Sequence, residues 1–150
     1  MGYNVYQGDE LIAENIEEKE YTVEGLTPNT DYSFSVSEVI GDKESEKATV
    51  TVKTKPVSVT SVAVAPKTNN LEVGATRQLN ATVEPSNATN KSVTFTSADD
   101  AVATVSSSGL VTAVAEGAAT ITVTTDDGGH TDTATINVTD PEPEPEVPED

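Results

Sequence analysis

A regular alternation of small or β-branched residues with polar residues fills positions 57–139 and constrains the fold more than any other feature of this chain. Short runs of Val, Thr, Ala and Ile are interrupted by turn-forming residues at intervals of about eight to twelve positions. Because successive side chains of a β-strand point to opposite faces, such runs predict strands with one buried face. The spacing of strands and turns is typical of a β-sandwich, so the sequence predicts an all-β protein.

The first 55 residues show the same period of two. Tyr32, Phe34 and Val36 alternate with serines and give its clearest example. Tyr6 is out of phase with Tyr3 and Val5, so we expect its side chain to face solvent or a partner. Four further strands are predicted near residues 3–5, 11–13, 21–23 and 48–52.

The charge of the chain excludes several classes of partner. Of its 150 residues, 26 are acidic and 8 basic, giving a net charge of −18. The net charge is −7 over residues 1–55, −5 over 56–139 and −6 over 140–150. A chain without a basic stripe cannot replace the counterions of nucleic acid, and anionic membrane surfaces repel it. We therefore expect no nucleic-acid partner and no membrane partner.

The composition also limits the chemistry that the chain can perform, although the absence of cysteine does not fix its compartment. The chain has no cysteine, which rules out disulfides, thiolate metal sites and thiol nucleophiles. It has no apolar run of about 18 residues that would predict a membrane span. The first residues do not resemble a signal peptide, and the last ones do not form an apolar anchor. We expect either a protein not exported by the usual route or an internal piece of a longer one.

Catalytic residues are not indicated. His130 is the only histidine and follows Gly128 and Gly129 in a predicted hairpin turn. A general base needs a positioned nucleophile and an orienting partner, and no G-x-S-x-G or comparable frame accompanies this histidine. We interpret it as an exposed loop residue, and we expect neither an enzyme nor a cofactor.

Sites for ions and sugars are only weakly indicated. Asp99 with Asp100, and Asp126 with Asp127, could form a weak calcium site if their loops met at one end of the sandwich. Otherwise they are ordinary turn aspartates. Sugars usually stack on an exposed aromatic side chain, but Phe95 is the only aromatic residue beyond the first segment, and we expect it to be buried.

The first segment resembles part of a known family. The stretches GYNVYQGDELIAENI, YTVEGLTPNTDYSFSVSEV and ESEKATVTVKT are similar to the later strands of a fibronectin type III domain. Leu26, Pro28, Thr30 and Tyr32 match the L-x-P-x-T-x-Y signature of that family. The resemblance implies a structural role for Tyr32 as a tyrosine corner, with its hydroxyl bonded to upstream backbone.

This resemblance is incomplete, because the first two strands of the family have no counterpart here. One sheet is expected to keep its partners, while the other is reduced to the strand near residues 21–23. The open apolar face could be covered by loops or a neighbouring domain, or by another chain or another copy of this one; a truncated chain is a third explanation. Tyr6, Leu11 and Ile12 are the candidate docking residues.

The second segment resembles the bacterial Ig-like domain of group 2. The matching stretches are VAVAP at 62–66, LEVG at 71–74, QLNATVEP at 78–85, ATNKSVT at 88–94, VATV at 102–105, GLVTA at 109–113 and GAATITV at 117–123. Phe95 stands where the family usually has tryptophan, and as a structural core residue it keeps the apolar volume.

These resemblances predict an immunoglobulin-like β-sandwich architecture in three parts. Residues 1–55 form a reduced fibronectin III-like module, residues 56–139 form a complete group 2 sandwich, and residues 140–150 form a disordered acidic tail in which proline alternates with acid. Only a few residues around Pro56 link the two modules.

The resemblance also implies a function. The chain is similar to small Ig-like virion proteins of tailed phages, which implies a non-enzymatic head or tail decoration protein located in the virion. Its partner would be a capsid or tail protein or another copy of itself, and host-surface carbohydrate would be a weak ligand. The alternative is a spacer or adhesion module of a bacterial cell-surface or extracellular protein.

Overall fold

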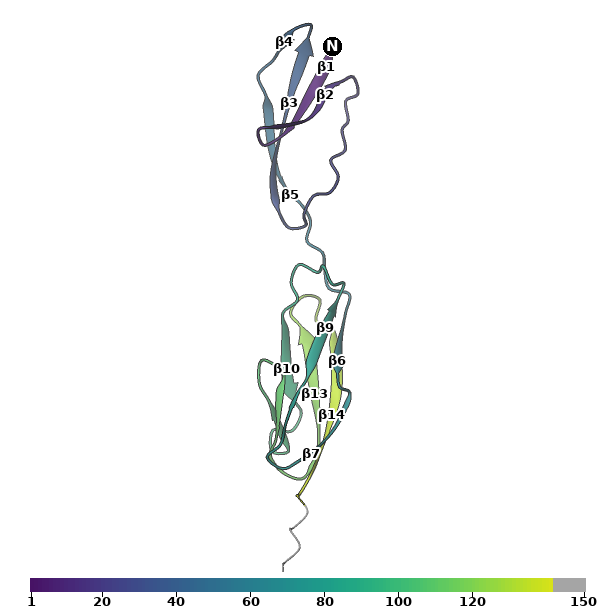
Figure 1. Ribbon diagram of the computed structural model, residues 1–150, viewed down its shortest axis with the longest axis vertical. Helices are drawn as coiled ribbons and strands as arrows, with labels where there is room; N and C mark the ends of the chain where they lie inside the picture. The colour runs from purple at the N-terminus through teal and green to yellow at the C-terminus, as the bar shows by residue number, and fades with distance from the viewer. Residues whose placement is uncertain (142–150) are drawn as a thin grey trace, which may run out of the picture. The chain divides into compact units, whose positions relative to one another are not determined.

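A computed structural model of the chain describes residues 1–141, which contain strands and no helix (Figure 1). The all-β prediction is therefore confirmed. The chain divides into two compact units, unit 1 at Met1–Val57 and unit 2 from Ser58 onward. Nearly all of the acidic tail predicted at 140–150 lies outside the described residues. In the described part of the chain, a search for helices long and apolar enough to cross a membrane found none.

Unit 1 is built on a single five-stranded sheet. Its central strand, β3, pairs antiparallel with β1 along one edge and with β5 and β4 along the other. The outer strand β2 pairs with β1 through a β-bulge near Val5 and Tyr6. The strands are β1 (Gly2–Gln7), β2 (Glu10–Ile16), β3 (Asp31–Ile40), β4 (Lys43–Glu44) and β5 (Ala48–Lys53).

The strand predicted near residues 21–23 is absent, and that prediction was wrong. The long connection from β2 to β3 is irregular and runs alongside the sheet without pairing to it (Figure 1). A strand needs a neighbour for its backbone N–H and C=O groups, and the second sheet that would supply one is missing from unit 1. We call residues 18–26 the strap.

Unit 2 is a sandwich of short strands. A four-stranded sheet has the order β10-β13-β14-β7, with β14 and β7 parallel, and smaller sheets pair β11-β12-β8 and β6-β9. The strands are β6 (Ser61–Ala65), β7 (Thr68–Glu72), β8 (Thr76–Gln78), β9 (Asn80–Glu84), β10 (Val93–Ser97), β11 (Ala103–Val105), β12 (Leu110–Ala113), β13 (Gly117–Thr125) and β14 (Thr131–Thr139).

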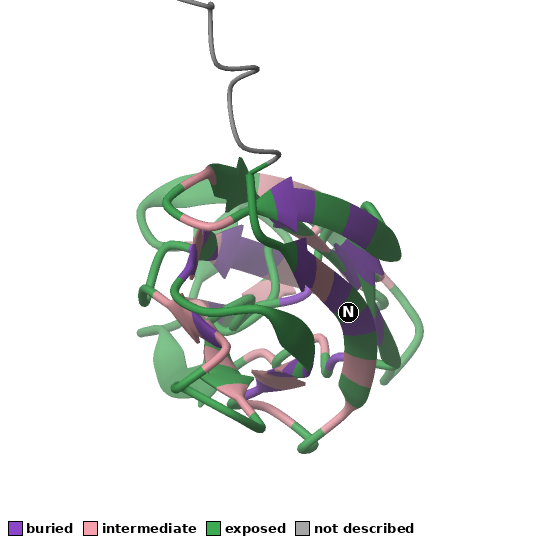
Figure 2. Cartoon of the chain, turned by 90° about the horizontal axis from the view of Figure 1, so that it is seen from below, coloured by how far each residue is buried: buried purple, intermediate pink, exposed green. Residues whose placement is uncertain are grey.

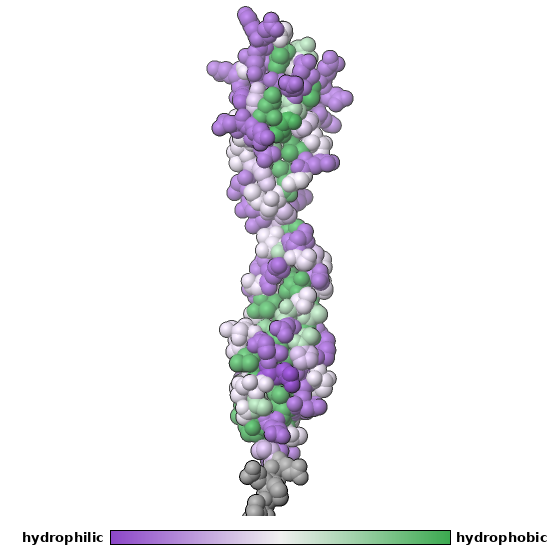
Figure 3. All heavy atoms as spheres, viewed as in Figure 1, coloured by the Kyte–Doolittle hydropathy of each residue, from purple (hydrophilic) through white to green (hydrophobic). Residues whose placement is uncertain are grey.

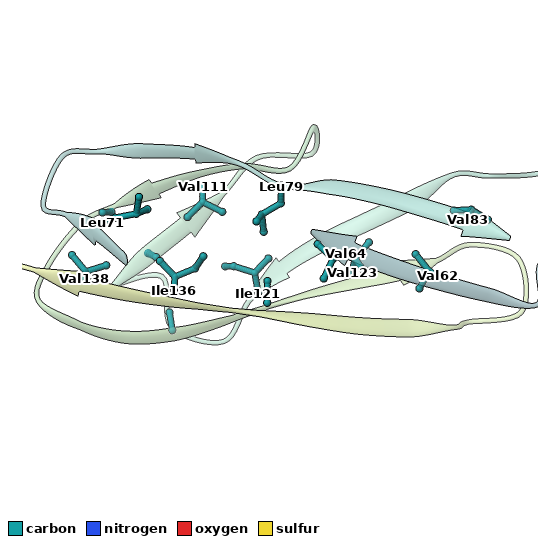
Figure 4. Packing of buried hydrophobic residues seen from close by; sticks show 14 of the residues in the cluster. Val62, Val64, Leu71, Leu79, Val83, Val111, Ile121, Val123, Ile136 and Val138 are labelled. Carbon is teal, nitrogen blue, oxygen red and sulfur yellow. The ribbon is translucent and has the colours of Figure 1, made fainter. Parts of the chain in front are cut away.

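The hydrophobic core of unit 2 follows the alternation in the sequence. Buried and exposed positions alternate along its strands, as on β6, where Val62 and Val64 are the buried residues (Figure 2). In Figure 4, Leu79 and Val111 point toward Ile121 and Ile136 from the opposite layer. Ile121 and Ile136 are 0% exposed, so the sheets exclude water along the centre of the unit.

A polar clamp fastens the first strand of unit 2 to the last one. The Asp132 carboxylate on β14 accepts hydrogen bonds from the Val64 backbone N–H on β6 and from the Lys67 ammonium. The hydrogen bond from Lys67, followed by the bond from Val64, lowers the pKa of Asp132 from 3.8 to about 2. The native fold therefore favours the ionised form of this carboxyl group.

This clamp predicts a contribution to stability that acid removes. Because the folded pKa of Asp132 lies below the unfolded value, its contribution is complete above pH 3.8 and declines as the pH falls toward about 2. The side chains of Lys67 and Asp132 are 59% and 21% exposed, so we expect a loss of only about 0.5–1 kcal/mol.

The measurement compares urea unfolding at pH 6 and pH 2.5 for the parent chain and two variants. Asp132→Asn should lose less stability on acidification than the parent, whereas Asp100→Asn, at an exposed aspartate, should behave like the parent. An equal response of Asp132→Asn and the parent to acid would contradict the clamp.

Candidate binding surface

Unit 1 has an apolar sheet face that no second sheet covers. The pairing of β1 with β3 places Val5 opposite Val36, and the pairing of β3 with β5 places Phe34 opposite Val50. Neighbouring residues across a sheet lie on the same face, so these side chains form one surface. Val36 is 41% exposed and Val50 is 56% exposed, which leaves much of this surface open to water.

The strap and this face enclose a cleft with a volume of about 540 Å³. Figure 3 shows hydrophobic residues as a band on the visible face of unit 1, with hydrophilic residues on both sides. The cleft is lined by Tyr3, Val5, Ile16, Glu18, Lys19, Glu20, Tyr21, Val23, Phe34 and Val36. The sequence predicted an open face, but it gave no sign that the strap would form one wall of a cleft.

Tyr6 lies on the opposite face of the sheet, and the expectation that it faces solvent or a partner was wrong. Its side chain is only 8% exposed. Its hydroxyl donates a hydrogen bond to the Glu44 carboxylate, and the Lys47 ammonium lies 3.3 Å from the ring centroid. Because side chains alternate along β1, Tyr6 is expected on the face opposite to Tyr3 and Val5. Only the folded chain shows that Glu44 and Lys47 cover its ring on that face.

The Glu44 carboxylate organises this opposite face. It accepts hydrogen bonds from the hydroxyls of Ser37 and Tyr6. Both bonds lower the pKa of Glu44, and the bond from Ser37 has the larger effect. Ser37 is 1% exposed, so its hydroxyl needs such an acceptor. Sequence reasoning missed Glu44, because a single acid in a charged turn looks like a solvated residue.

The other two candidate docking residues are more exposed than Tyr6. Leu11 pairs with Tyr6 across β1 and β2 and is 44% exposed, so it lies on the face opposite the cleft. Ile12 is the extra residue at the β-bulge and is half-buried. Tyr6 and Leu11 are therefore neighbours on one face, but Leu11 is exposed there whereas Glu44 and Lys47 cover the Tyr6 ring.

Tyr32 braces the end of the connection into β3. The Thr27 backbone N–H donates a hydrogen bond of 2.9 Å to the Tyr32 hydroxyl, which is the upstream backbone contact of a tyrosine corner. Hydrogen bonding to the Thr27 side chain and then to its backbone lowers the pKa of Tyr32. The Tyr32 ring also stacks on Phe34, with 6.1 Å between the ring centroids.

The aspartates proposed for calcium do not converge. Asp99 and Asp100 follow the end of β10 at Ser97, whereas Asp126 lies beside Ser92 at the beginning of that strand. Four steps along a strand separate these ends by roughly 13 Å. Asp99 caps its own turn through the Ala101 N–H. Within residues 1–141, His, Asp and Glu form no group of three that could hold a metal ion.

The turn between β13 and β14 holds the segment that leads into β6. Asp127 accepts a hydrogen bond of 2.9 Å from the Val59 N–H. The Nε2–H of His130 donates to the Val59 carbonyl over 3.1 Å, since a carbonyl oxygen can only accept. His130 is thus half-buried in a structural contact. The sequence had predicted an exposed loop residue, and the structure differs from that prediction.

Phe95 lies on the inner side of β10. It is partly buried and packs against the core of unit 2, where the edge of its ring touches Gly109. It therefore offers no exposed ring on which a sugar could stack.

Comparison with known proteins places both units in families. Residues 58–136 match the family described as Bacterial Ig-like domain (group 2), and residues 1–52 match the Fibronectin type III domain. The S-layer protein rSbsC, in a crystal structure of residues 31–844, covers 95% of this chain at a TM-score of 0.54 and 23% identity, with 21% of that chain matched. This likeness supports the sandwich fold alone.

Relatives of higher identity come from phages and bacteria. An Ig-like virion protein of Serratia phage KSP90 is 46% identical over 101 residues, which are 67% of this chain and 37% of that protein. A kappa-carrageenase of Pseudoalteromonas carrageenovora is 44% identical over 82 residues, 55% of this chain and 21% of the enzyme. The matched part of the chain thus spans well under half of the length of these relatives. It belongs to the bacterial Ig-like (group 2) family, and residues 1–52, which precede the family domain, match part of the fibronectin type III family.

Proposed function

We propose that this chain is a non-enzymatic structural protein of a bacteriophage virion, which decorates the head or tail. The observation that carries the proposal is the 46% identity to an Ig-like virion protein over 101 residues. Unit 1 would attach to the particle, and unit 2 would be displayed. The core of unit 2 is closed, whereas unit 1 has an open apolar face, and this contrast supports the division of roles.

We further propose that unit 2 contacts host-surface carbohydrate weakly. The similarity to part of a kappa-carrageenase supports a polysaccharide as the ligand. Unit 2 has no exposed aromatic platform in its described residues, so recognition would rely on polar loop groups, and a low affinity for a single copy is expected. Many copies on one particle would raise the overall strength of attachment.

The test is the composition of particles purified by density-gradient centrifugation from the lysate that produces the protein. Peptides of residues 58–136 should be present in a fixed ratio to the major capsid protein and should stay in that ratio after a second gradient. An abundant cytoplasmic host protein serves as the control and should decline between the gradients. Loss of this chain together with the control would contradict a place in the virion.

The second candidate is a spacer or adhesion module of a bacterial surface or secreted protein. It is favoured by the similarity to the kappa-carrageenase. In that case the same peptides should be found in the cell-wall or medium fraction of cultures free of phage particles.

A further inference from the structure

We propose that the cleft of unit 1 binds one extended β-strand from a different virion subunit, and that this strand carries apolar residues in alternation with basic ones. The inference rests on the proposed virion function and names the chemistry of the partner. It combines three observations: an apolar floor, a strap with unpaired backbone, and the sign of the charge around the cleft.

The floor of the cleft has the surface of half a sandwich. Val5, Phe34 and Val36 present side chains from β1 and β3, and Val36 remains 41% exposed. In a complete sandwich the residues of a second sheet cover such a face at a separation of about 10 Å. The described residues of unit 1 form one sheet only, so no second sheet covers this face.

The strap supplies the backbone partner that a strand requires. Among the hydrogen bonds of the described residues, one alone involves positions 18–26: the Tyr21 hydroxyl donates to the Ile12 carbonyl over 3.3 Å. The backbone N–H and C=O groups of the strap are therefore open to a neighbouring strand. Tyr21 and Val23 already line the cleft, so a strand that paired with the strap would place its own alternate side chains on the same apolar floor.

The negative charge of unit 1 indicates which kind of strand the cleft would bind. Unit 1 carries 12 acidic and 5 basic residues, and the charged residues that line the cleft are Glu18, Lys19 and Glu20, with a net charge of −1. A second copy of this chain would bring the same excess of negative charge, which disfavours self-association. Lysine or arginine on the outward side of a bound strand would lie across from Glu20 and Glu24, where opposite charges stabilise a pair of strands.

The experiment measures hydrogen exchange by mass spectrometry on the whole chain with two synthetic peptides as probes. The basic peptide KVTVKVTVK should slow exchange of alternate amides in residues 18–26 by about tenfold or more, because a strand that pairs along one side of the strap hydrogen-bonds every second N–H. The acidic peptide EVTVEVTVE, which has the same apolar residues, should leave them unchanged.

Two variants locate the binding surface. Val36→Glu places a charge on the floor of the cleft and should abolish the protection. Leu11→Glu changes a residue of similar exposure, 44%, on the opposite face and should leave the protection intact. Far-UV circular dichroism checks that both variants keep the sheet.

Three outcomes would overturn the inference: no protection by the basic peptide, equal protection by both peptides, or protection along β5 instead of the strap. A dimer in sedimentation analysis that Val36→Glu dissociates would also overturn it, because a second copy would then fill the cleft. The peptides need no phage particle, so failure here, with the protein present in purified virions, would reject the strand inference alone.

Discussion

Replacing Ile121 by alanine is expected to cost unit 2 about 2–5 kcal/mol of unfolding free energy. The Ile121 side chain is 0% exposed and lies in the middle of β13, between neighbours on β10 and β14. Removing three carbons from a close-packed interior loses their burial and leaves a cavity that the paired strands cannot close. A domain of this size is typically stable by only about 5–15 kcal/mol, so the loss is severe.

Urea unfolding followed by far-UV circular dichroism measures this effect, and two variants calibrate it. Ile121→Val should cost about 0.5–1.5 kcal/mol. Thr120→Ala, on the exposed face of the same strand, should change the stability by no more than about 0.5 kcal/mol. All four tyrosines lie in unit 1 and the chain has no tryptophan, so tyrosine fluorescence follows unit 1 separately. Equal effects of Ile121→Ala and Thr120→Ala would contradict the packing described for β13.

Replacing Gly109 by alanine is expected to cost about 2–4 kcal/mol, from two separate causes. Gly109 has a φ of +84°, a left-handed conformation that costs a residue with a side chain about 1–2 kcal/mol. A Cβ atom there would also lie 2.7 Å from the Leu79 carbonyl oxygen and 2.9 Å from the Phe95 ring. The Leu79 backbone cannot easily retreat, because its N–H is bonded to the Gly109 carbonyl.

A second glycine separates these two causes. Gly129 also has a positive φ, +62°, but a Cβ atom there would meet nothing within 4 Å. Gly129→Ala should therefore cost only the conformational part, about 1–2 kcal/mol. Adding Phe95→Leu to Gly109→Ala should recover little stability if the Leu79 carbonyl is the main obstacle. Similar losses for Gly109→Ala and Gly129→Ala would show that the contact with Leu79 is not tight.

The sequence predicted most of unit 2 because there the local pattern and the burial agree. Val62 and Val64 on β6, or Ile121 and Val123 on β13, alternate with polar residues in a strict period of two, and a buried face fixes that period. Unit 1 was predicted less well. Residues 21–23 have the same alternation, but they form no strand because their hydrogen-bonding partner is missing.

The parts of the surface that sequence reasoning misplaced depend on contacts between distant positions. Tyr6 is buried by Glu44 and Lys47, about forty positions away, and nothing near Tyr6 in the sequence indicates that cover. The aspartate pairs could be evaluated only once the pairing of β10 with β13 placed them at opposite ends of β10. Local patterns predict which face of a strand is apolar, and pairing between distant segments decides what covers it.

Immunogold electron microscopy of the culture that produces the protein, with antibody raised against residues 58–136, tests the central claim most directly. A virion decoration protein predicts gold in a regular array on phage heads or tails, with no label on particles of an unrelated phage. Label on bacterial cell walls and none on particles would contradict the virion assignment and would indicate a module of a surface or secreted bacterial protein.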